Sequence, residues 1–478
     1  MDEQCNSSAG ASADGANVKL QRHLDNRHIQ LISISGAIGT GLFMGSGKVI
    51  ALSGTSIVLV YAIIGVFVFF IMRAMGEMLL ANSKFHSFAD FVHAYLGPQA
   101  GFVLSWSYWL SWCVAAVGDV VVVVAGFFQY WYPDAPVWLP ALVTLFVLLG
   151  LNMLAVKVFG EVEFWFGLIK IIAIVLLIIT ALVMVASGYT SPNGVTASFS
   201  HLVDKGVMMP HGLTGFFAGF QLAIFSFVGT ELIGTTAAEA KNPERVLPKA
   251  INTIPVRILL FYITALICII SVVSWAQVPD NRSPFVELFV LAGLPAAAGI
   301  INFVVLTSAA SSANSGIYSG GRMLFGLSQQ RQAPQSLSKL TRSGAPVSAL
   351  LFSGCCMLAA LLLLFIIPEV MTVFILLSTV SAVMIIITWS LILLSYLAYR
   401  KQHPELHKQS KFKLPGGRVT AIASQLFLLF VLGLLTLEPA TRSALYVMPF
   451  WYLGLYVVYR RKTSSANRLV KTSTGFSS

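Results

Sequence analysis

The segment SISGAIGTGLFMGSG, Ser33–Gly47, has glycines spread through an apolar block, and the segment GFFAGFQLAIFSFVGTELIGTT, Gly215–Thr236, has the same character. Each block is long enough to cross a membrane, yet each is interrupted by glycine near its middle. A backbone break at that depth is tolerated only where the exposed N–H and C=O groups line a cavity or bind a ligand. Paired interruptions, one in each half of a chain, indicate a transporter with a central binding site.

The rest of the chain consists of similar apolar blocks. Its 478 residues are 57% hydrophobic and 10% charged, whereas soluble proteins carry about 25% charged residues. Such blocks predict an all-α polytopic membrane protein, because only helices satisfy their own backbone hydrogen bonds in lipid. Twelve transmembrane helices are predicted, over Ile29–Ile50, Thr55–Met75, Gly101–Trp131, Val137–Met153, Phe164–Ala186, Leu213–Thr235, Ile258–Ser274, Ala296–Leu327, Val347–Ile366, Met371–Tyr399, Ala421–Leu437 and Leu445–Tyr459.

The basic surplus, 30 Lys and Arg against 19 Asp and Glu, is interpreted as a topology signal. With the N-terminus in the cytoplasm, the outward loops contain only Lys48, Lys205, Arg282 and Arg442, and almost all other basic residues lie in inner segments. This asymmetry follows the positive-inside rule. It predicts a multi-pass protein of the cytoplasmic (inner) membrane with both termini in the cytoplasm, and it argues against a nucleic-acid partner.

We expect one permease-like membrane domain, residues 29–462, between a cytoplasmic N-terminal tail, residues 1–28, and a cytoplasmic C-terminal tail, residues 463–478. The N-terminal tail lacks an apolar core followed by a cleavage site, so no cleaved signal peptide is expected. The five cysteines are scattered without a CxxC pair and are interpreted as packing residues. We expect no enzyme activity, no cofactor and no metal, because no nucleophile stands beside a placed base.

The breaks suit a zwitterion. A helix that starts at a break directs partial positive charge toward a carboxylate, while carbonyl groups at a break accept from an ammonium. We therefore interpret Gly39, Gly41 and Gly229 as backbone breaks and a small amino acid as the substrate. The alternative, close packing of helices, is favoured for the outer glycines. The GxxxG pairs to which it applies are Gly41–Gly45, Gly215–Gly219 and Gly316–Gly320.

Three ionisable residues fall inside predicted spans: Asp119, Lys170 and Glu231. A charged side chain within the membrane has a high free-energy cost, so such residues are candidates for function. Burial also disfavours the charged form of each group. Each is therefore a candidate to load and release a proton, the alternative being a permanent ion pair or hydrogen bond. The hydroxyl groups of the eighth span are expected mainly to bond their own helix, with Ser308 or Ser312 bordering the Lys170 site.

Two further groups are assigned other roles. Charged residues of the short cytoplasmic loops are expected to form inner-gate salt bridges or turns, and a tryptophan group is expected in an interfacial belt or packing face. The loop residues are Arg73, Glu77, Glu161, Glu163, Glu239 and Arg245, and the tryptophans are Trp106, Trp109 and Trp112.

Five motifs carry a family resemblance: NRHIQLISISGAIGTGLF (26–43), SFADFVHAYLGPQAG (87–101), VKVFGEVEFWFGLIK (156–170), FSFVGTELIGTTAAEAKNPERVLPKAI (225–251) and NFVVLTSAASSANSGIYSGGRMLFGLS (302–328). Together they resemble the amino acid transporter family of the amino acid–polyamine–organocation superfamily, from about Leu20 to about Lys462. The stretch SPFVELFVLAGLPAAAGIINFVVLTSAASSANSG (283–316) is most similar to the bacterial D-serine/D-alanine/glycine transporters of that family.

The resemblance implies a leucine-transporter-type fold, with a 5+5 inverted repeat and two extra helices, and import of D-serine, D-alanine and glycine by proton symport. It implies that Lys170 stands where related carriers hold a sodium ion, and that Phe225 occupies the place of an aromatic gate. The positions implied for the substrate are Ile38, Gly39, Thr40, Gly41, Phe225, Ser226, Phe227, Val228 and Gly229.

Several alternatives stay open at this point. The cargo could instead be L-alanine, L-asparagine or an aromatic amino acid, and the protein could be an obligate exchanger. A sensor or channel fits less well, because paired breaks indicate one central site rather than a continuous pore. The expected partners are the amino acid substrate, the proton as coupling ion and the lipid bilayer, with a monomer or weak dimer as the assembly.

Overall fold

The computed structural model describes residues 37–474 apart from 83, 86, 132–137, 155, 193, 205, 237–242, 279–281, 292, 342–343 and 368. The expected N-terminal tail, residues 1–28, and Glu239 lie outside the described residues. Within them the α-helices are α2 (Ser46–Ser53), α3 (Ile57–Ala81), α4 (Phe88–Leu96), α5 (Pro98–Tyr130), α6 (Trp138–Asn152), α7 (Val156–Ala186), α8 (Gly212–Ala223), α9 (Leu232–Thr236), α10 (Pro243–Val272), α11 (Pro284–Leu291), α12 (Pro295–Gln329), α13 (Val347–Leu361), α14 (Leu363–Ile366), α15 (Val370–Gln402), α16 (Pro404–Gln409), α17 (Gly417–Leu434) and α18 (Pro439–Thr474).

Long apolar helices dominate the described residues. Nine helical segments are long and apolar enough to cross a membrane, and α6 is apolar but shorter. One of the nine, Gly41–Ala81, has 41 residues, about twice what one crossing needs. It is divided into α2 and α3 at Gly54, whose φ of 59° is in the left-handed region. The all-α, polytopic fold is thus confirmed, and the count of twelve stays a prediction.

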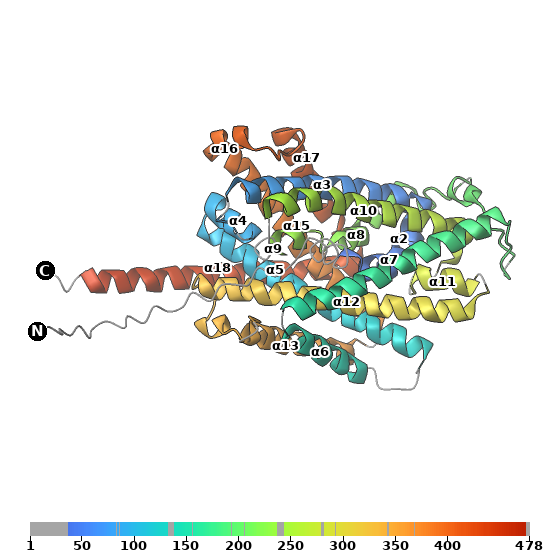
Figure 1. Cartoon of the computed structure of the whole chain (residues 1–478), viewed down its shortest axis with the longest axis horizontal. Coiled ribbons are helices and arrows are strands. Elements are labelled where there is room, and N and C mark those ends of the chain that lie inside the picture. Colours follow the sequence, from blue (N-terminus) through green and yellow to red (C-terminus); the bar gives the residue numbers. More distant parts are fainter. Residues whose placement is uncertain are drawn as a thin grey trace, which may run out of the picture.

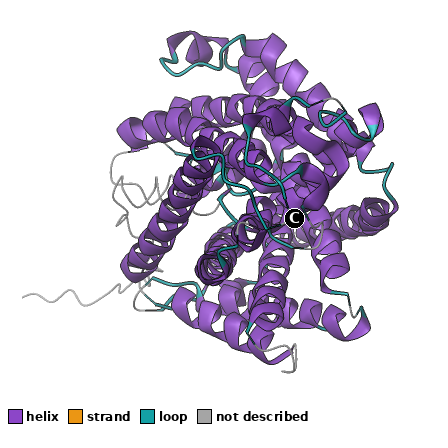
Figure 2. Ribbon diagram, turned by 90° about the vertical axis from the view of Figure 1, so that its right-hand side faces the viewer, coloured by secondary structure: helices purple, strands orange, loops and turns teal. Residues whose placement is uncertain are grey.

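The helices pack in two groups, and each group takes members from both halves of the chain. In the first, α3 packs on α10 and α2 packs on α8; in the second, α5 packs along α12, with α6 and α13 beside them. Most of the long helices run along the long axis of the molecule in Figure 1, and Figure 2 looks along that axis. This pairing agrees with the two-half arrangement that the resemblance implies.

Burial separates the central helices from the peripheral ones. In the most apolar part of the segment Gly212–Thr235, 83% of residues are buried, against 33% for Val158–Ala186. The peripheral α7 exposes large apolar side chains at helical spacing, among them Ile172, Leu176 and Ile179, as expected of a face that meets lipid. The interrupted segment around Gly229 therefore lies at the centre of the protein.

The last helix extends into the range expected for the C-terminal tail. Helix α18 continues to Thr474, through most of the range assigned to a C-terminal tail. Its last turns project beyond the helix bundle in Figure 1, at the same end of the molecule as α4 and α16.

Candidate substrate site at two helix breaks

The first break lies at the start of the described chain. The backbone N–H of Gly39 donates to the Ala37 carbonyl at 2.9 Å, which is a turn and not a helical bond. The chain then enters a π-helical turn, Gly41–Gly45, that leads into α2. Such wide turns recur at functional sites, and a helix that starts here turns its positive end toward the break.

The second break follows α8. A 3₁₀ turn, Ile224–Phe227, ends the helix, and Val228 is extended with φ −60° and ψ 135°. Gly229 has φ 102°, a conformation that side-chain-bearing residues rarely adopt. Helix α9 resumes only at Leu232. The backbone therefore leaves the helix at Gly229, as the glycine pattern predicts, and the carbonyl end of α8 faces the break.

The two breaks touch each other backbone to backbone. A Cβ atom on Gly41 would lie 2.6 Å from Cα and 2.8 Å from N of Ser226, so only glycine fits there. The hydroxyl of Tyr262, on α10, lies 2.8 Å from both the Ala37 and the Ser226 carbonyl oxygens and donates to them. The Tyr61 hydroxyl, on α3, pairs with the Ser226 hydroxyl at 2.8 Å. Both halves of the chain thus meet at one point.

A small cavity opens between the breaks. It is lined by Ala37, Gly39, Thr40, Gly41, Trp112, Ala115, Phe225, Val228 and Ser312. Its free volume is about 10 Å³, roughly the space of one water molecule. The start of one helix and the end of another therefore face a space that holds about one water molecule.

The structure brings five of the expected substrate positions to this cavity and places the others around it. Gly39, Thr40, Gly41, Phe225 and Val228 line the cavity. Phe225 packs edge-on against Phe374 at 6.2 Å between ring centroids. The remaining positions hold the breaks in place.

These supporting positions have defined contacts. The Ile38 carbonyl accepts from the Ser308 hydroxyl at 3.0 Å. Phe227 packs in a ring cluster with Tyr61 and Tyr262. Ser308 is thus hydrogen-bonded to the first break.

Sequence reasoning missed four residues of the cavity wall: Ala37 beside the first break, and three residues of α5 and α12. Trp112 was assigned to a belt or packing face, yet it is buried and lines the cavity with Ala115. Ser312, expected beside Lys170, also lines the cavity, and a Cβ on Gly39 would lie 2.8 Å from its Oγ. The residues of α5 and α12 belong to uninterrupted helices, so no local signal in the sequence separates them from ordinary core.

Asp119 is joined to the first break. The Thr40 hydroxyl donates a short hydrogen bond to Asp119 Oδ1, and Asp119 is only 1% exposed. Its Oδ2 has no hydrogen-bond partner by distance and angle among the described residues, although the Ser312 side chain lies near enough to influence the carboxyl. Thr40, which lines the cavity, therefore links this buried carboxyl group to it.

Glu231 is joined to the second break. Its two carboxyl oxygens accept from the Gly229 N–H at 3.2 and 3.1 Å, and the side chain is fully buried. The Tyr108 hydroxyl lies 3.5 Å from Glu231 Oε1 and 3.4 Å from the Ser319 hydroxyl. Ser319 donates onward to Thr235 at 3.2 Å. Each break thus carries one buried carboxyl group.

Lys170 is buried on α7 in the field of two carboxyl groups, those of Glu163 and Asp119. The placement of Glu163 in a cytoplasmic loop was wrong, because its side chain is fully buried inside the helical segment Val158–Ala186. Glu163 accepts from Ser311 at 2.8 Å and from the Asn314 amide at 2.7 Å. A glutamate three residues after Gly160 looks exposed in the sequence, and only its helical phase with Lys170, seven residues later, could have indicated burial.

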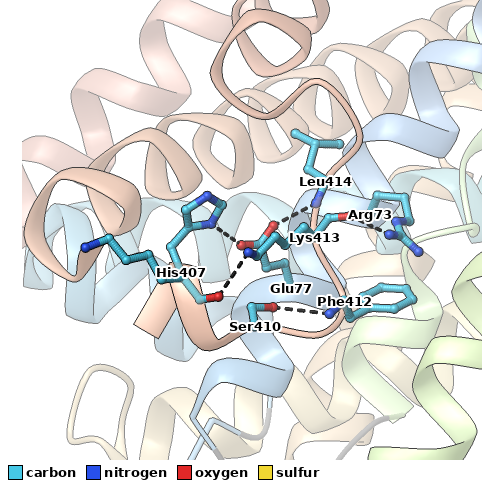
Figure 3. Close-up of polar contacts among 8 residues, drawn as sticks. Arg73, Glu77, His407, Ser410, Phe412, Lys413 and Leu414 are labelled. Carbon is cyan, nitrogen blue, oxygen red and sulfur yellow. Dashed lines mark hydrogen bonds and ion pairs between the residues drawn. The ribbon is translucent and has the colours of Figure 1, made fainter. Parts of the chain in front are cut away.

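A second polar cluster lies at the far end of α3. Glu77 is fully buried, and its carboxylate pairs with His407 Nδ1 at 2.6 Å and accepts from the Leu414 N–H at 2.7 Å (Figure 3). Glu77 thus lies on α3 rather than in a loop, and its partners come from the connection between α15 and α17.

Arg73 completes this cluster one turn earlier on α3. Its guanidinium donates to the Lys413 carbonyl and, at 2.7 Å, to Asn252 Oδ1 of α10. The same group lies 3.8 Å from the Phe412 ring centroid (Figure 3). We call this set the α3 clamp, and its members are Arg73, Glu77, His407, Phe412, Lys413 and Leu414.

Comparison with known proteins gives consistent matches over nearly the whole chain. Residues 28–468 match the family described as "Amino acid permease". A D-serine/D-alanine/glycine transporter of Escherichia coli is 55% identical over 440 residues, 92% of this chain and 93% of the relative. An amino-acid permease of Bacillus subtilis is 47% identical over 95% of this chain and 98% of its own length. A DL-alanine permease of Lactococcus lactis is 41% identical over 92% and 96%.

Proposed function

The chain belongs to the amino acid permease family, and from this premise we propose that it imports small neutral amino acids such as D-serine, D-alanine and glycine across the cytoplasmic membrane. It acts as a secondary active transporter with proton symport and alternating access. Its membrane orientation, with both termini in the cytoplasm, follows the charge bias of its loops.

One observation carries the proposal: the cavity between the two breaks combines opposite helix ends. The π-helical turn Gly41–Gly45 starts there, and the 3₁₀ turn Ile224–Phe227 ends there. Helix starts attract carboxylates and exposed carbonyls attract ammonium groups. These are the two charged ends of every α-amino acid, so the site favours that class of substrate.

The large side chains in the cavity wall favour the smallest members of the class. Trp112, Phe225 and Val228 close the cavity from the sides, and only about 10 Å³ of free volume remains. The relative with 55% identity carries D-serine, D-alanine and glycine by its name. A hydroxyl group at Thr40 and another at Ser312 are suitable partners for the serine side chain.

Proton coupling rests on three buried groups. Asp119 is bonded to the first break, Glu231 to the second, and Lys170 stands in the field of Asp119 and Glu163. A carboxyl that binds a proton when the site faces outward and releases it inward would make substrate movement depend on the proton gradient. We propose that the proton, rather than sodium, is the coupling ion.

Uptake of labelled glycine into right-side-out membrane vesicles tests this function. We expect accumulation under an inward proton gradient, its loss when the gradient is collapsed, and competition by unlabelled D-alanine and D-serine. Vesicles without the protein serve as the control. Failure of D-alanine and D-serine to compete would contradict the substrate assignment, and L-alanine, L-serine, L-threonine and L-asparagine in the same series would identify the actual cargo.

A second candidate, obligate exchange of amino acids, is favoured by the near-closed cavity, which would need substrate to reopen. The same vesicles separate the two functions. Net accumulation of glycine in vesicles that contain no amino acid supports symport, whereas uptake only into preloaded vesicles supports exchange.

A further inference from the structure

We propose that Trp112 sets the upper size limit of the transported side chain. This inference rests on the proposed function, because it concerns the same cavity. Trp112 is a fully buried side chain on α5 and forms one wall of the space between the breaks. It is the largest side chain of the lining, which also includes Gly39 and Gly41, where only backbone faces the space.

The Trp112 indole packs against Gly316 of α12. A Cβ atom on Gly316 would run into Cε3 of Trp112 and lie 3.1 Å from Cζ3. The six-membered edge of the ring therefore rests directly on the α12 backbone. Helices α5 and α12 form the most extensive helix pair of the described chain, so the ring cannot retreat without parting them.

Tyr108, one turn earlier on α5, prevents the Trp112 ring from moving along the helix. Tyr108 lies edge-on to Trp112, with ring centroids 6.3 Å apart, and its hydroxyl faces Glu231 and Ser319. The indole thus fills the space between the cavity and the Glu231 hydrogen bonds. A longer substrate side chain directed at this wall would have to displace a ring that is fixed on two sides.

The expected change follows from the volume of the ring. Replacing the indole by a phenyl ring leaves the aromatic wall in place but withdraws it by several atoms. In apolar pockets one methylene changes discrimination about 10- to 200-fold. We therefore expect Trp112→Phe to lower the concentration of D-valine or D-leucine that half-inhibits glycine uptake by about 10-fold or more, with a smaller change for D-alanine.

The reverse change should narrow the cavity. Gly316→Ala adds a methyl group that pushes the ring toward the substrate, so uptake of D-serine should fall further than uptake of glycine. Combining Gly316→Ala with Trp112→Phe should restore D-serine uptake, because the smaller ring leaves room for the methyl group. This rescue distinguishes an effect through Trp112 from general damage to helix packing.

Trp109→Phe is the matched control. Trp109 is a buried indole one turn away on α5 that bonds Ser353 at 2.9 Å and is not part of the cavity lining. Its substitution should leave the order of competing amino acids unchanged. Membrane levels of each variant are measured by detergent extraction and size-exclusion chromatography of the full-length protein.

The outcomes are separable from those of the proposed function. If the unmodified protein takes up no glycine, the proposed function fails, and the competition series is repeated with the cargo that it does carry. If the unmodified protein takes up glycine but Trp112→Phe shows the unmodified order and strength of competition, the assignment of Trp112 is overturned. Failure of the double variant to recover D-serine uptake would also count against it.

Discussion

The residue at position 41 decides how closely the two breaks can approach. Gly41 faces the backbone of Ser226, and atoms of a backbone in a packed core cannot move aside as a flexible side chain can. Gly45, four residues later in the same π-helical turn, has open space, since a Cβ there would lie 3.9 Å from the nearest atom, the Thr40 carbonyl oxygen. The GxxxG pair thus combines a strict position with a permissive one.

We expect Gly41→Ala to abolish transport and to lower stability, because overpacking a core costs about 1–3 kcal/mol and the methyl group separates the breaks. Gly45→Ala should be tolerated or slightly stabilising, since alanine is the better helix former by up to about 1 kcal/mol. Thermal unfolding in detergent and glycine uptake measure both. Equal behaviour of the two variants would contradict the backbone contact.

Which residues the sequence could predict depended on local signals. Gly39, Gly41 and Gly229 stand out because glycine in an apolar span is itself a backbone signal. Trp112 and Glu163 gave no such signal, because their roles follow from the rotation of α5 and α7 about their axes. That rotation is set by packing against neighbouring helices, which a single sequence does not display.

At the scale of elements, the α3 clamp ties one helix of the first group to the connection between α15 and α17. Two kinds of interaction hold the connection. The Glu77 carboxylate accepts hydrogen bonds from His407 and from the Leu414 N–H. The Arg73 guanidinium donates to the Lys413 carbonyl and stacks on the Phe412 ring. Gly76 permits this approach, because a Cβ there would lie 2.8 Å from the Phe412 ring. The connection therefore acts as a structural part of the bundle end.

We expect Glu77→Gln to loosen this connection, because hydrogen bonds to a charged group contribute about 1.5–3 kcal/mol. Glu405→Gln is the control, since Glu405 pairs with Lys408 at 2.8 Å with both side chains about 70% exposed, and exposed pairs contribute little. Limited proteolysis between α16 and α17 and thermal unfolding report the difference. Equal protection in both variants would show that the clamp does not hold the connection.

Element boundaries were predicted less well than element existence. The apolar blocks predicted every long span that the structure describes, but α18 runs past its expected end and α4 and α16 were not predicted as separate helices. Such short helices lack the long apolar run that identifies a span. Hydropathy therefore predicted the long apolar spans, and packing decided where the helices end.

At the scale of the whole molecule, the proposed proton symport requires that substrate and proton bind as one event. The two carboxyl groups lie at different breaks, Asp119 on the second helix group and Glu231 on the interrupted segment. A movement of one group against the other would alter both carboxyl environments together. The sequence singled out these residues as ionisable groups within predicted spans, while their attachment to Thr40 and Gly229 required the folded structure.

We expect Asp119→Asn and Glu231→Gln to remove proton-driven accumulation of glycine while counterflow exchange persists, because an amide resembles a permanently protonated carboxyl. Lys170→Met should also lose accumulation. The control is Glu369→Gln, an exposed carboxylate at the start of α15 that accepts from Thr372. Vesicle uptake with and without a pH gradient measures both activities, and normal accumulation in any variant would exclude that residue from coupling.

The Tyr262 hydroxyl has one hydrogen but two carbonyl acceptors, those of Ala37 and Ser226. The hydrogen is shared between them only while the breaks stay together. When they separate, it can remain with one oxygen and leave the other to an arriving ammonium group. The Tyr262 hydroxyl would then occupy the position of the substrate's ammonium group until the substrate arrives. Substrate entry would replace one hydrogen-bond donor by another, so that both carbonyl groups keep a donor.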